Sequence, residues 1–186
     1  LSRLWLSYNS LRTINASTFQ GLGALAELAL THNSITEIEP GAFQGLDRLT
    51  DLTLRNNSIS EVGALSNLRK LEGFDAGANS LRVLRTGVLR DAKRLRVVLL
   101  DDNALRTVEP NAFSETGSLD WVWIPGNELN CSQFVAAMPI TSRAFTCLDS
   151  VYCRIDQSID TPSEIDDGAC DADLDNEGCA WDGGDC

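Results

Sequence analysis

Residues 49–59 read Leu-Thr-Asp-Leu-Thr-Leu-Arg-Asn-Asn-Ser-Ile, and this stretch decides the fold of the chain. Leucines hold its first, fourth and sixth positions, asparagine holds the ninth (Asn57), and isoleucine holds the eleventh (Ile59). The central leucines alternate with polar residues, and this period of two predicts a short β-strand with one buried face. A strand this short cannot bury that face alone, so we expect neighbouring strands of the same kind.

The same pattern occurs six times along the chain. Its ninth positions are spaced 24, 24, 22, 24 and 24 residues apart, at Asn9, Asn33, Asn57, Asn79, Asn103 and Asn127. We therefore expect six coils that stack their strands into one parallel sheet. Each asparagine amide has both a donor and an acceptor, so the column is expected to pair buried backbone groups of adjacent coils. Such groups would cost about 1–3 kcal/mol each if they were left unpaired.

Two further apolar columns lie between the strands. The first is Ile14, Ile38, Val62, Leu84 and Val108, and the second is Phe19, Phe43 and Phe113, with Leu89 in the fourth unit. We expect both columns to be core on the convex side. The third unit is two residues short and lacks its phenylalanine, so we expect a local change on that side near Gly63–Leu68.

The pattern L-x-x-L-x-L-x-x-N-x-L resembles the leucine-rich repeat family, in its extracellular form with 24-residue units. The resemblance covers residues 1–130. It implies an α/β-type solenoid with short parallel strands on a concave face and an irregular convex side. It also implies that the residues between the framework leucines point to solvent on the concave face, which is the candidate binding surface.

These solvent-facing positions change freely from unit to unit and include large aromatic residues at both ends of the array. Tryptophan and tyrosine are enriched at interface hot spots. The candidate partner-binding residues are Trp5, Tyr8, His32, Asp75, Val97, Leu99, Trp121 and Trp123. Two alternatives stay open: the C-terminal cap covers Trp121 and Trp123, or an N-terminal cap belongs over Trp5 and Tyr8.

An acidic stretch is expected on the same face, at Asp51, Asp75, Asp101 and Asp102. It could select a basic partner, although an ordinary solvated face explains it equally well. An enzyme is not expected. His32 is the only histidine, so any Ser–His–Asp or Cys–His arrangement would have to use it, and the chain has no Gly-rich phosphate loop.

The net charge of −12 is concentrated at the C-terminal end. Residues 149–186 hold twelve acidic side chains and one base, whereas the repeat region is nearly neutral. We find no basic stripe in the sequence and therefore expect no nucleic-acid ligand. No apolar run reaches the roughly 18 residues that a membrane span needs, so membrane insertion is not expected of this segment.

All six cysteines follow residue 130, at Cys131, Cys147, Cys153, Cys170, Cys179 and Cys186. An even number of cysteines in an acidic segment, without a CxxC pair, favours disulfides over a zinc site. Disulfides imply an oxidising compartment, so we expect a secreted protein or the extracellular face of a cell surface. Three glycosylation sequons, at Asn15, Asn56 and Asn130, are compatible with a glycoprotein.

Residues 131–152 resemble the C-terminal cap of leucine-rich repeat proteins. A short helix is expected at residues 132–138, beginning at Ser132 and ending before Pro139, over the open edge of the last coil. The family cap has four cysteines, whereas this one retains Cys131 and, most simply, Cys147 as its partner. Because of that departure the pairing stays open.

Residues 153–186 end in Cys179-Ala-Trp-Asp-Gly-Gly-Asp-Cys186, and their spacing resembles the Lin-12/Notch repeat, a small calcium-binding module. The departure is Leu174, which stands where the family has a cysteine. The resemblance implies the disulfides Cys153–Cys179 and Cys170–Cys186. It also implies that Ca²⁺ is held by Asp167, Asp182 and Asp185, with Asp171 and Asp175 assisting.

Two alternatives for this segment stay open. Asp171, Asp173 and Asp175 also resemble the start of an EF-hand loop, although Asn176 stands at the position of its required glycine. The segment could instead be an acidic tail held by disulfides without a metal. The expected domains are therefore 1–130, six leucine-rich repeats; 131–152, a cap; and 153–186, a disulfide-rich calcium module.

The function expected from the sequence is extracellular recognition of a protein or peptide on the concave face, with a structural calcium site at the C-terminal end. One alternative is an adhesive or spacer ectodomain of a larger surface protein. Another is an accessory domain of an extracellular enzyme. We expect a monomer.

Overall fold

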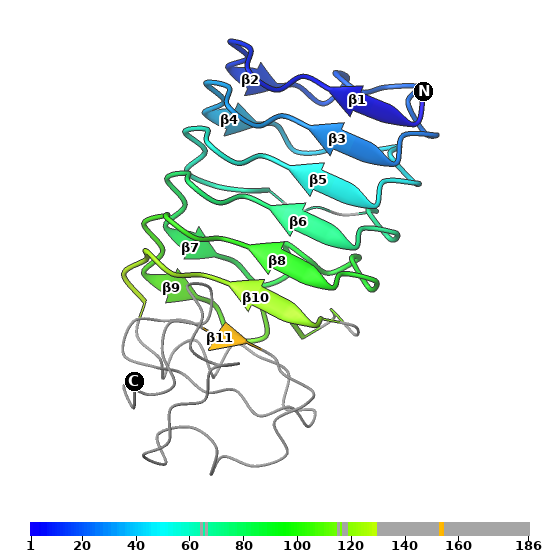
Figure 1. Ribbon diagram of the computed structural model, residues 1–186. Coiled ribbons are helices and arrows are strands. Elements are labelled where there is room, and N and C mark those ends of the chain that lie inside the picture. Colours follow the sequence, from blue (N-terminus) through cyan, green and yellow to red (C-terminus); the bar gives the residue numbers. More distant parts are fainter. Residues whose placement is uncertain (64, 66, 115, 117–118, 130–152, 155–186) are drawn as a thin grey trace, which may run out of the picture.

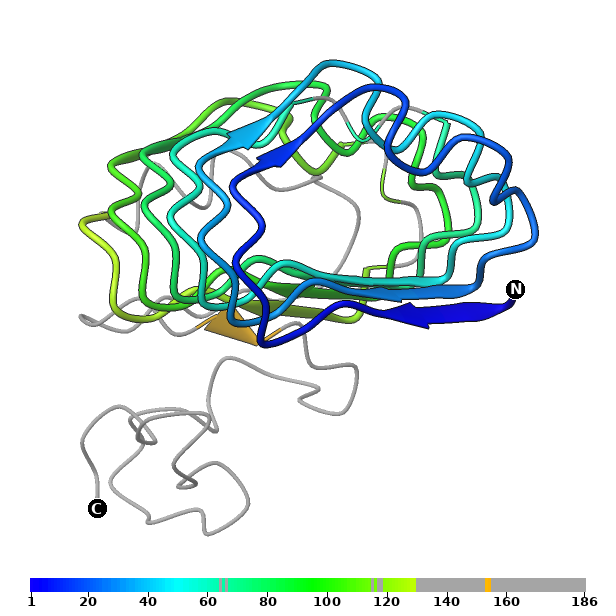
Figure 2. The same cartoon turned by 90° about the horizontal axis from the view of Figure 1, so that it is seen from above.

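The computed structural model describes residues 1–63, 65, 67–114, 116, 119–129, 153 and 154. The described chain winds into a solenoid with one long sheet as a wall (Figures 1 and 2). This sheet has the order β1-β3-β5-β6-β8-β10-β11. Its strands are β1 (Arg3–Trp5), β3 (Glu27–Ala29), β5 (Asp51–Thr53), β6 (Gly73–Asp75), β8 (Val97–Leu99), β10 (Trp121–Trp123) and β11 (Cys153–Arg154).

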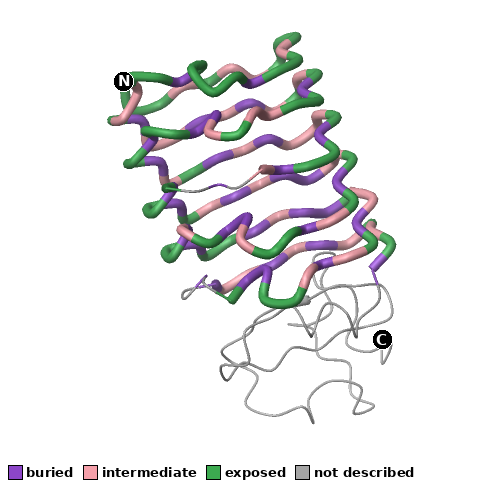
Figure 3. Tube along the Cα trace, turned by 180° about the vertical axis from the view of Figure 1, so that it is seen from behind, coloured by how far each residue is buried: buried purple, intermediate pink, exposed green. Residues whose placement is uncertain are grey.

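The six strands that the repeat pattern predicts are all present and parallel. Equivalent residues pair in register, so that Leu4 aligns with Leu28, Leu28 with Leu52, and Leu52 with Phe74. The central residue of β3, β5, β6, β8 and β10 is 0–1% exposed, and buried (purple) segments recur from coil to coil in Figure 3. The interior is one apolar core that runs from coil to coil.

β11 is the one strand of the sheet that the repeat pattern did not predict. It pairs antiparallel to β10, with Trp121 opposite Arg154 and Val122 opposite Cys153. The backbone at Cys153 thus belongs to the repeat sheet, at the residue where the sequence placed the start of a separate module.

The asparagine column forms the bonds expected of it. Asn57 Nδ2 donates to Leu30 O of the preceding coil (3.0 Å) and to Leu54 O of its own coil (2.8 Å), while its Oδ1 accepts from Ile35 N (2.9 Å). Bonds of the same kind recur at Asn33, Asn79, Asn103 and Asn127. We call these five residues the asparagine ladder. Asn9, in the first coil, donates only within its own coil.

The opposite side of the solenoid is more regular than expected. Two short parallel ladders lie there: β2 (Thr13–Ile14) with β4 (Glu37–Ile38), and β7 (Val83–Leu84) with β9 (Thr107–Val108). Between them, Val62 of the third coil is buried but belongs to no strand. The interruption falls in the short third unit, where a local change was expected.

The α/β description of the solenoid needs correction. The described residues contain no helix, and turns connect their strands. Each return path is bent by hydrogen bonds that span three residues, such as Gln20 N to Ser17 O (3.1 Å) and Leu25 N to Leu22 O (2.8 Å). Because turns of this kind, without a helix, connect strands that pair in ladders, the described part of the chain is a β-solenoid.

The predicted cap at 131–152, the expected helix at 132–138 and the module after Arg154 lie outside the described residues. The same holds for Asn130 and for every cysteine except Cys153.

Candidate binding face

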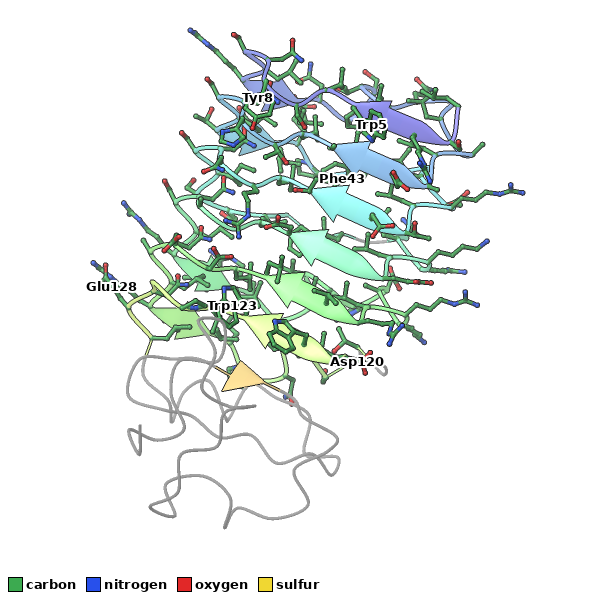
Figure 4. All side chains as sticks on the ribbon, viewed as in Figure 1. Trp5, Tyr8, Phe43, Asp120, Trp123 and Glu128 are labelled. Carbon is green, nitrogen blue, oxygen red and sulfur yellow. The ribbon has the colours of Figure 1, made fainter. Side chains whose placement is uncertain are left out.

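One wall of the solenoid carries the side chains that the sequence singled out. We call it the sheet face: the third, fifth, seventh and eighth positions of each unit, on and just after the strands of the long sheet. Figure 4 shows it from the front, with Trp5 and Tyr8 in the first coil and Trp123 in the sixth. Trp5 is 69% exposed and Tyr8 77% exposed, far more than a large apolar side chain ordinarily is.

A shallow hollow of about 430 Å³ crosses β1, β3, β5, β6 and β8. Trp5 borders it at one end, and Val97 and Leu99 border it at the other. The floor is low because Ala29 has a short side chain and Gly73 has none. A Cβ at Gly73 would lie 3.0 Å from Asp51 Oδ1, so glycine leaves room for that carboxylate.

A second hollow, of about 700 Å³, adjoins the first and extends to Trp121. Trp121 and Trp123 are half-buried, and their rings stack with centroids 6.1 Å apart. Four strands of the sheet lie between them and Trp5. The two aromatic pairs therefore form separate ends of one face, with the hollows between them.

Tyr8, His32 and Asn56 form a ladder of their own along the edge of the sheet face. The rings of Tyr8 and His32 stack with centroids 4.4 Å apart and planes 14° apart. The Nε2 atom at the edge of the His32 ring lies 3.2 Å from Asn56 Nδ2. The structure thus brings together two predicted site residues and a predicted glycosylation site.

The backbone of this eighth position is left-handed in every unit. The φ values are positive at Tyr8, His32, Asn56, Ala78, Asp102 and Gly126. Such a conformation costs an ordinary residue about 1–2 kcal/mol, and only glycine, asparagine and aspartate adopt it readily. Those types fill half of the column, which is the signal that sequence reasoning could have used. Tyr8, His32 and Ala78 adopt the left-handed conformation although their residue types do not favour it.

Arg55 is a residue of the sheet face that the sequence pattern did not single out. Its Nε lies 3.1 Å from Asp75 Oδ2, and its Nη2 donates to Asp101 Oδ1 in the coil after that. The hydrogen bond to Asp101, with the nearby charges of both aspartates, raises the pKa of the Arg55 guanidinium against the opposing effect of burial. We call these two ion pairs, which share Arg55, the Arg55 bridge.

Gly77 makes the Arg55 bridge possible. It occupies the seventh position of the coil that lies between Arg55 and Asp101. A Cβ at Gly77 would lie 2.6 Å from both the Arg55 guanidinium carbon and Asp101 Oδ1. The guanidinium thus passes through space that any other residue would fill.

The expected acidic stretch needs correction. Asp75 and Asp101 are engaged by Arg55, and Asp101 is only 7% exposed. Of the four carboxylates, Asp51 and Asp102 stay exposed on the sheet face. Glu27, beside Asp51 in the sheet, forms an ion pair with Arg3 at 3.0 Å. The negative charge offered to a ligand is therefore smaller and more local than the sequence suggested.

The remaining site predictions fall elsewhere. Asn15 is exposed in a turn outside the sheet face, and its carbonyl accepts from Thr18 N (3.0 Å). The expected calcium ligands lie outside the described residues. Within the described ranges, no group of three His, Cys, Asp or Glu side chains could hold a metal ion. No described helix is long and apolar enough to cross a membrane.

Comparison with known proteins agrees with this architecture. A family model described as "Leucine rich repeat" matches residues 1–59 and 24–81. A search of curated proteins found no match. Among solved structures, 224 chains match.

One of these structures is described as "Crystal structure of TLR13-ssRNA13 complex". It is 29% identical to this chain and aligns with a TM-score of 0.52, over 70% of this chain and 22% of its own. This chain thus spans less than a quarter of that protein. Together the two matches support a leucine-rich repeat protein with a parallel-strand β-solenoid.

Proposed function

We propose that this leucine-rich repeat chain is an extracellular recognition module that binds a protein or peptide across its sheet face. The observation that carries the proposal is the exposure of Trp5 and Tyr8 at one end of a hollow that crosses five strands. Aromatic side chains that are presented to solvent on a rigid sheet lose little conformational entropy on binding, so they suit an interface hot spot.

The Tyr8–His32–Asn56 ladder supports the same role. Tyr8 and His32 hold left-handed backbones that cost free energy, and they present stacked rings to solvent. The left-handed backbone recurs in every unit, so what distinguishes this end of the face is that exposed aromatic rings occupy the position. The stacked rings of Tyr8 and His32 would already have their bound conformation, so a partner would not need to order them on binding.

A protein ligand suits the sheet face better than a nucleic acid. The TLR13 structure holds single-stranded RNA, as its title says. In this chain the hollow is lined by Glu27, Asp51 and Asp75, with no Lys or Arg among its lining residues. Glu27 and Asp75 are already paired with Arg3 and Arg55. A phosphate would therefore meet the Asp51 carboxylate and no cation among the lining residues, whereas a peptide with basic and apolar side chains would find both charge and apolar contacts.

The extracellular setting and the calcium site are part of the proposal and rest on the sequence. Six cysteines and the acidic segment at 153–186 favour a disulfide-held module, in which Asp167, Asp182 and Asp185 would supply oxygen ligands to Ca²⁺. Titration calorimetry of the oxidised chain with Ca²⁺ tests the metal site. Heat that is unchanged in an Asp182→Asn/Asp185→Asn variant would contradict it.

A binding screen with matched variants tests the recognition role. The immobilised chain is screened against displayed extracellular domains and peptides, and the Kd of each hit is measured with wild type and two double variants. Trp5→Ser/Tyr8→Ser removes the aromatic end of the sheet face, and Arg12→Ser/Arg82→Ser changes two exposed residues outside it.

We expect the aromatic double variant to raise Kd by about 30-fold or more, as the loss of a hot spot would, and the control to stay within about twofold. Hits that bind both variants equally well would refute the sheet face as the binding surface.

A further inference from the structure

A second charged surface lies away from the sheet face, in the turns that lead into the strands of the long sheet. In each unit a tight turn precedes the first framework leucine. It is closed by hydrogen bonds such as Leu49 N to Leu46 O, Leu71 N to Leu68 O and Leu95 N to Ala92 O, each 3.0 Å. These turns stack along one edge of the solenoid (Figure 1).

The two central residues of these turns differ between coils. They are Gly23-Ala24 before β3, Asp47-Arg48 before β5, Arg69-Lys70 before β6 and Lys93-Arg94 before β8. Three consecutive coils thus contribute five cations and one carboxylate. We call Arg48, Arg69, Lys70, Lys93 and Arg94 the basic edge.

The strand register places these cations in a column. Asp51 pairs with Gly73 and Gly73 with Val97, so the residues three positions earlier, Arg48, Lys70 and Arg94, also occupy equivalent places in successive coils. Neighbouring strands lie about 4.8 Å apart. In the sequence these residues are 22 and 24 positions apart, so no basic stripe is visible there. The column forms only when the coils stack. The expectation that the chain has no basic stripe therefore needs correction.

The basic edge is unneutralised. All five side chains are exposed, and none of them forms an ion pair within the described part of the chain. By contrast, Arg96, which directly precedes β8, is paired with Asp120 at 2.7 Å. Asp47, Glu72 and Asp91 are the acids of these same turns, and Asp91 also accepts from Asn67 N (3.0 Å), so the five cations still outnumber the carboxylates beside them. Like charges stacked this closely repel one another, and a polyanion along the edge would relieve that repulsion.

We propose that the basic edge binds a sulfated polysaccharide. Its cations run in a line across three coils, so they match a linear chain with repeated negative charges. Single-stranded nucleic acid is another linear polyanion, and its binding sites combine cations with aromatic rings on which bases stack. Residues 45–50, 67–72 and 91–96 contain no aromatic side chain. The edge therefore offers charge without a stacking platform, which favours sulfate groups on a sugar chain.

The experiment measures the affinity of the full oxidised chain for heparin, for desulfated heparin and for a poly(U) RNA oligomer over a range of salt concentrations. One variant, Lys70→Ser/Arg94→Ser, removes two cations from the column. Its matched control, Arg12→Ser/Arg82→Ser, removes two exposed cations elsewhere. Both variants have the same net charge, so only the location of the charge differs.

We expect wild type to bind heparin and not desulfated heparin. The column variant should bind heparin about tenfold or more weakly, and its slope of log Kd against log salt should fall by about two, because each lost contact removes about one released counterion. The control should match wild type. Equal weakening by both variants, equal binding of desulfated heparin, or tighter binding of poly(U) than of heparin would each overturn the proposal. The sheet-face variant Trp5→Ser/Tyr8→Ser distinguishes the basic edge from the sheet face, since it should leave heparin affinity unchanged.

Discussion

The asparagine ladder and the Arg55 bridge both tie one coil to another, but they do so by different rules. Each ladder asparagine forms the same bonds to backbone groups, five times over, at one-coil intervals. The Arg55 bridge occurs once, joins side chains, and reaches Asp101 across an intervening coil that must be empty at Gly77.

The difference separates what a stack of coils requires from what one surface adds. Buried backbone groups must be paired wherever the coils meet, so an asparagine of this kind recurs at each junction between two coils. An ion pair between side chains is optional, and its net value depends on how far both partners are buried. The first kind of contact therefore defines the fold, and the second kind shapes one face of it.

Removing one rung of the asparagine ladder should have the largest effect. Asn57→Ala leaves Ile35 N without its acceptor. It also removes one of the two amide donors at each of the carbonyls of Leu30 and Leu54, which keep Asn33 and Asn79. We expect a loss of about 2–4 kcal/mol in the free energy of unfolding, measured by urea denaturation. Asn9→Ala is the matched control, because Asn9 is exposed and bonds only within its own coil, and it should cost less than about 1 kcal/mol. Equal losses at the two positions would mean that bonds between coils are not what the ladder contributes.

Filling the gap under the Arg55 bridge should have an intermediate effect. In Gly77→Ala the new Cβ displaces the Arg55 guanidinium and leaves the buried Asp101 carboxylate without its partner. We expect a loss of about 1–3 kcal/mol in the same denaturation experiment. Gly63→Ala serves as the control, since nothing lies within 4 Å of its Cβ position, and should be close to neutral.

Gly77→Ala in a background that lacks the Arg55 bridge shows whether loss of the bridge causes the destabilisation. If Gly77→Ala acts by breaking it, the same substitution in an Arg55→Met/Asp101→Asn background should cost less than about 1 kcal/mol, because the interaction has already been removed. An undiminished cost in that background would place the effect in the backbone of the coil.

Relieving strain at the eighth position should have the smallest effect, and of opposite sign. Ala78 has a φ of 50°, which glycine adopts freely. Ala78→Gly should stabilise the chain by about 0.5 kcal/mol, since the strain removed slightly exceeds the added entropy of the unfolded chain. Ala76→Gly, two residues earlier at a fully buried site without positive φ, should destabilise it. Thermal unfolding of both variants compares them, and destabilisation by Ala78→Gly would contradict the strain argument.

Much of the sheet face could be assigned from sequence because the strand has a period of two. That period places Trp5, Val97 and Trp121 on the outer side of leucines at fixed positions, and the structure shows them there. The same reasoning could not show that Asp75 and Asp101 are neutralised by Arg55. A pattern of residue types in the sequence does not identify which side chains of different coils contact one another. The regular ladders on the convex side were missed for a related reason: two-residue strands are too short to show a period.

The sequence by itself determined the repeat, the register of the strands and the role of the asparagines, because each follows from spacing and from the need to pair buried backbone groups. Only the tertiary structure decided which variable residues meet. Stacking brings together residues that lie one or two units apart, so that Arg55 reaches Asp101, Tyr8 stacks on His32, and Arg48, Lys70 and Arg94 form a single column. These contacts depend on the size and charge of neighbours in other coils, and it is here that the surface chemistry of the molecule is set.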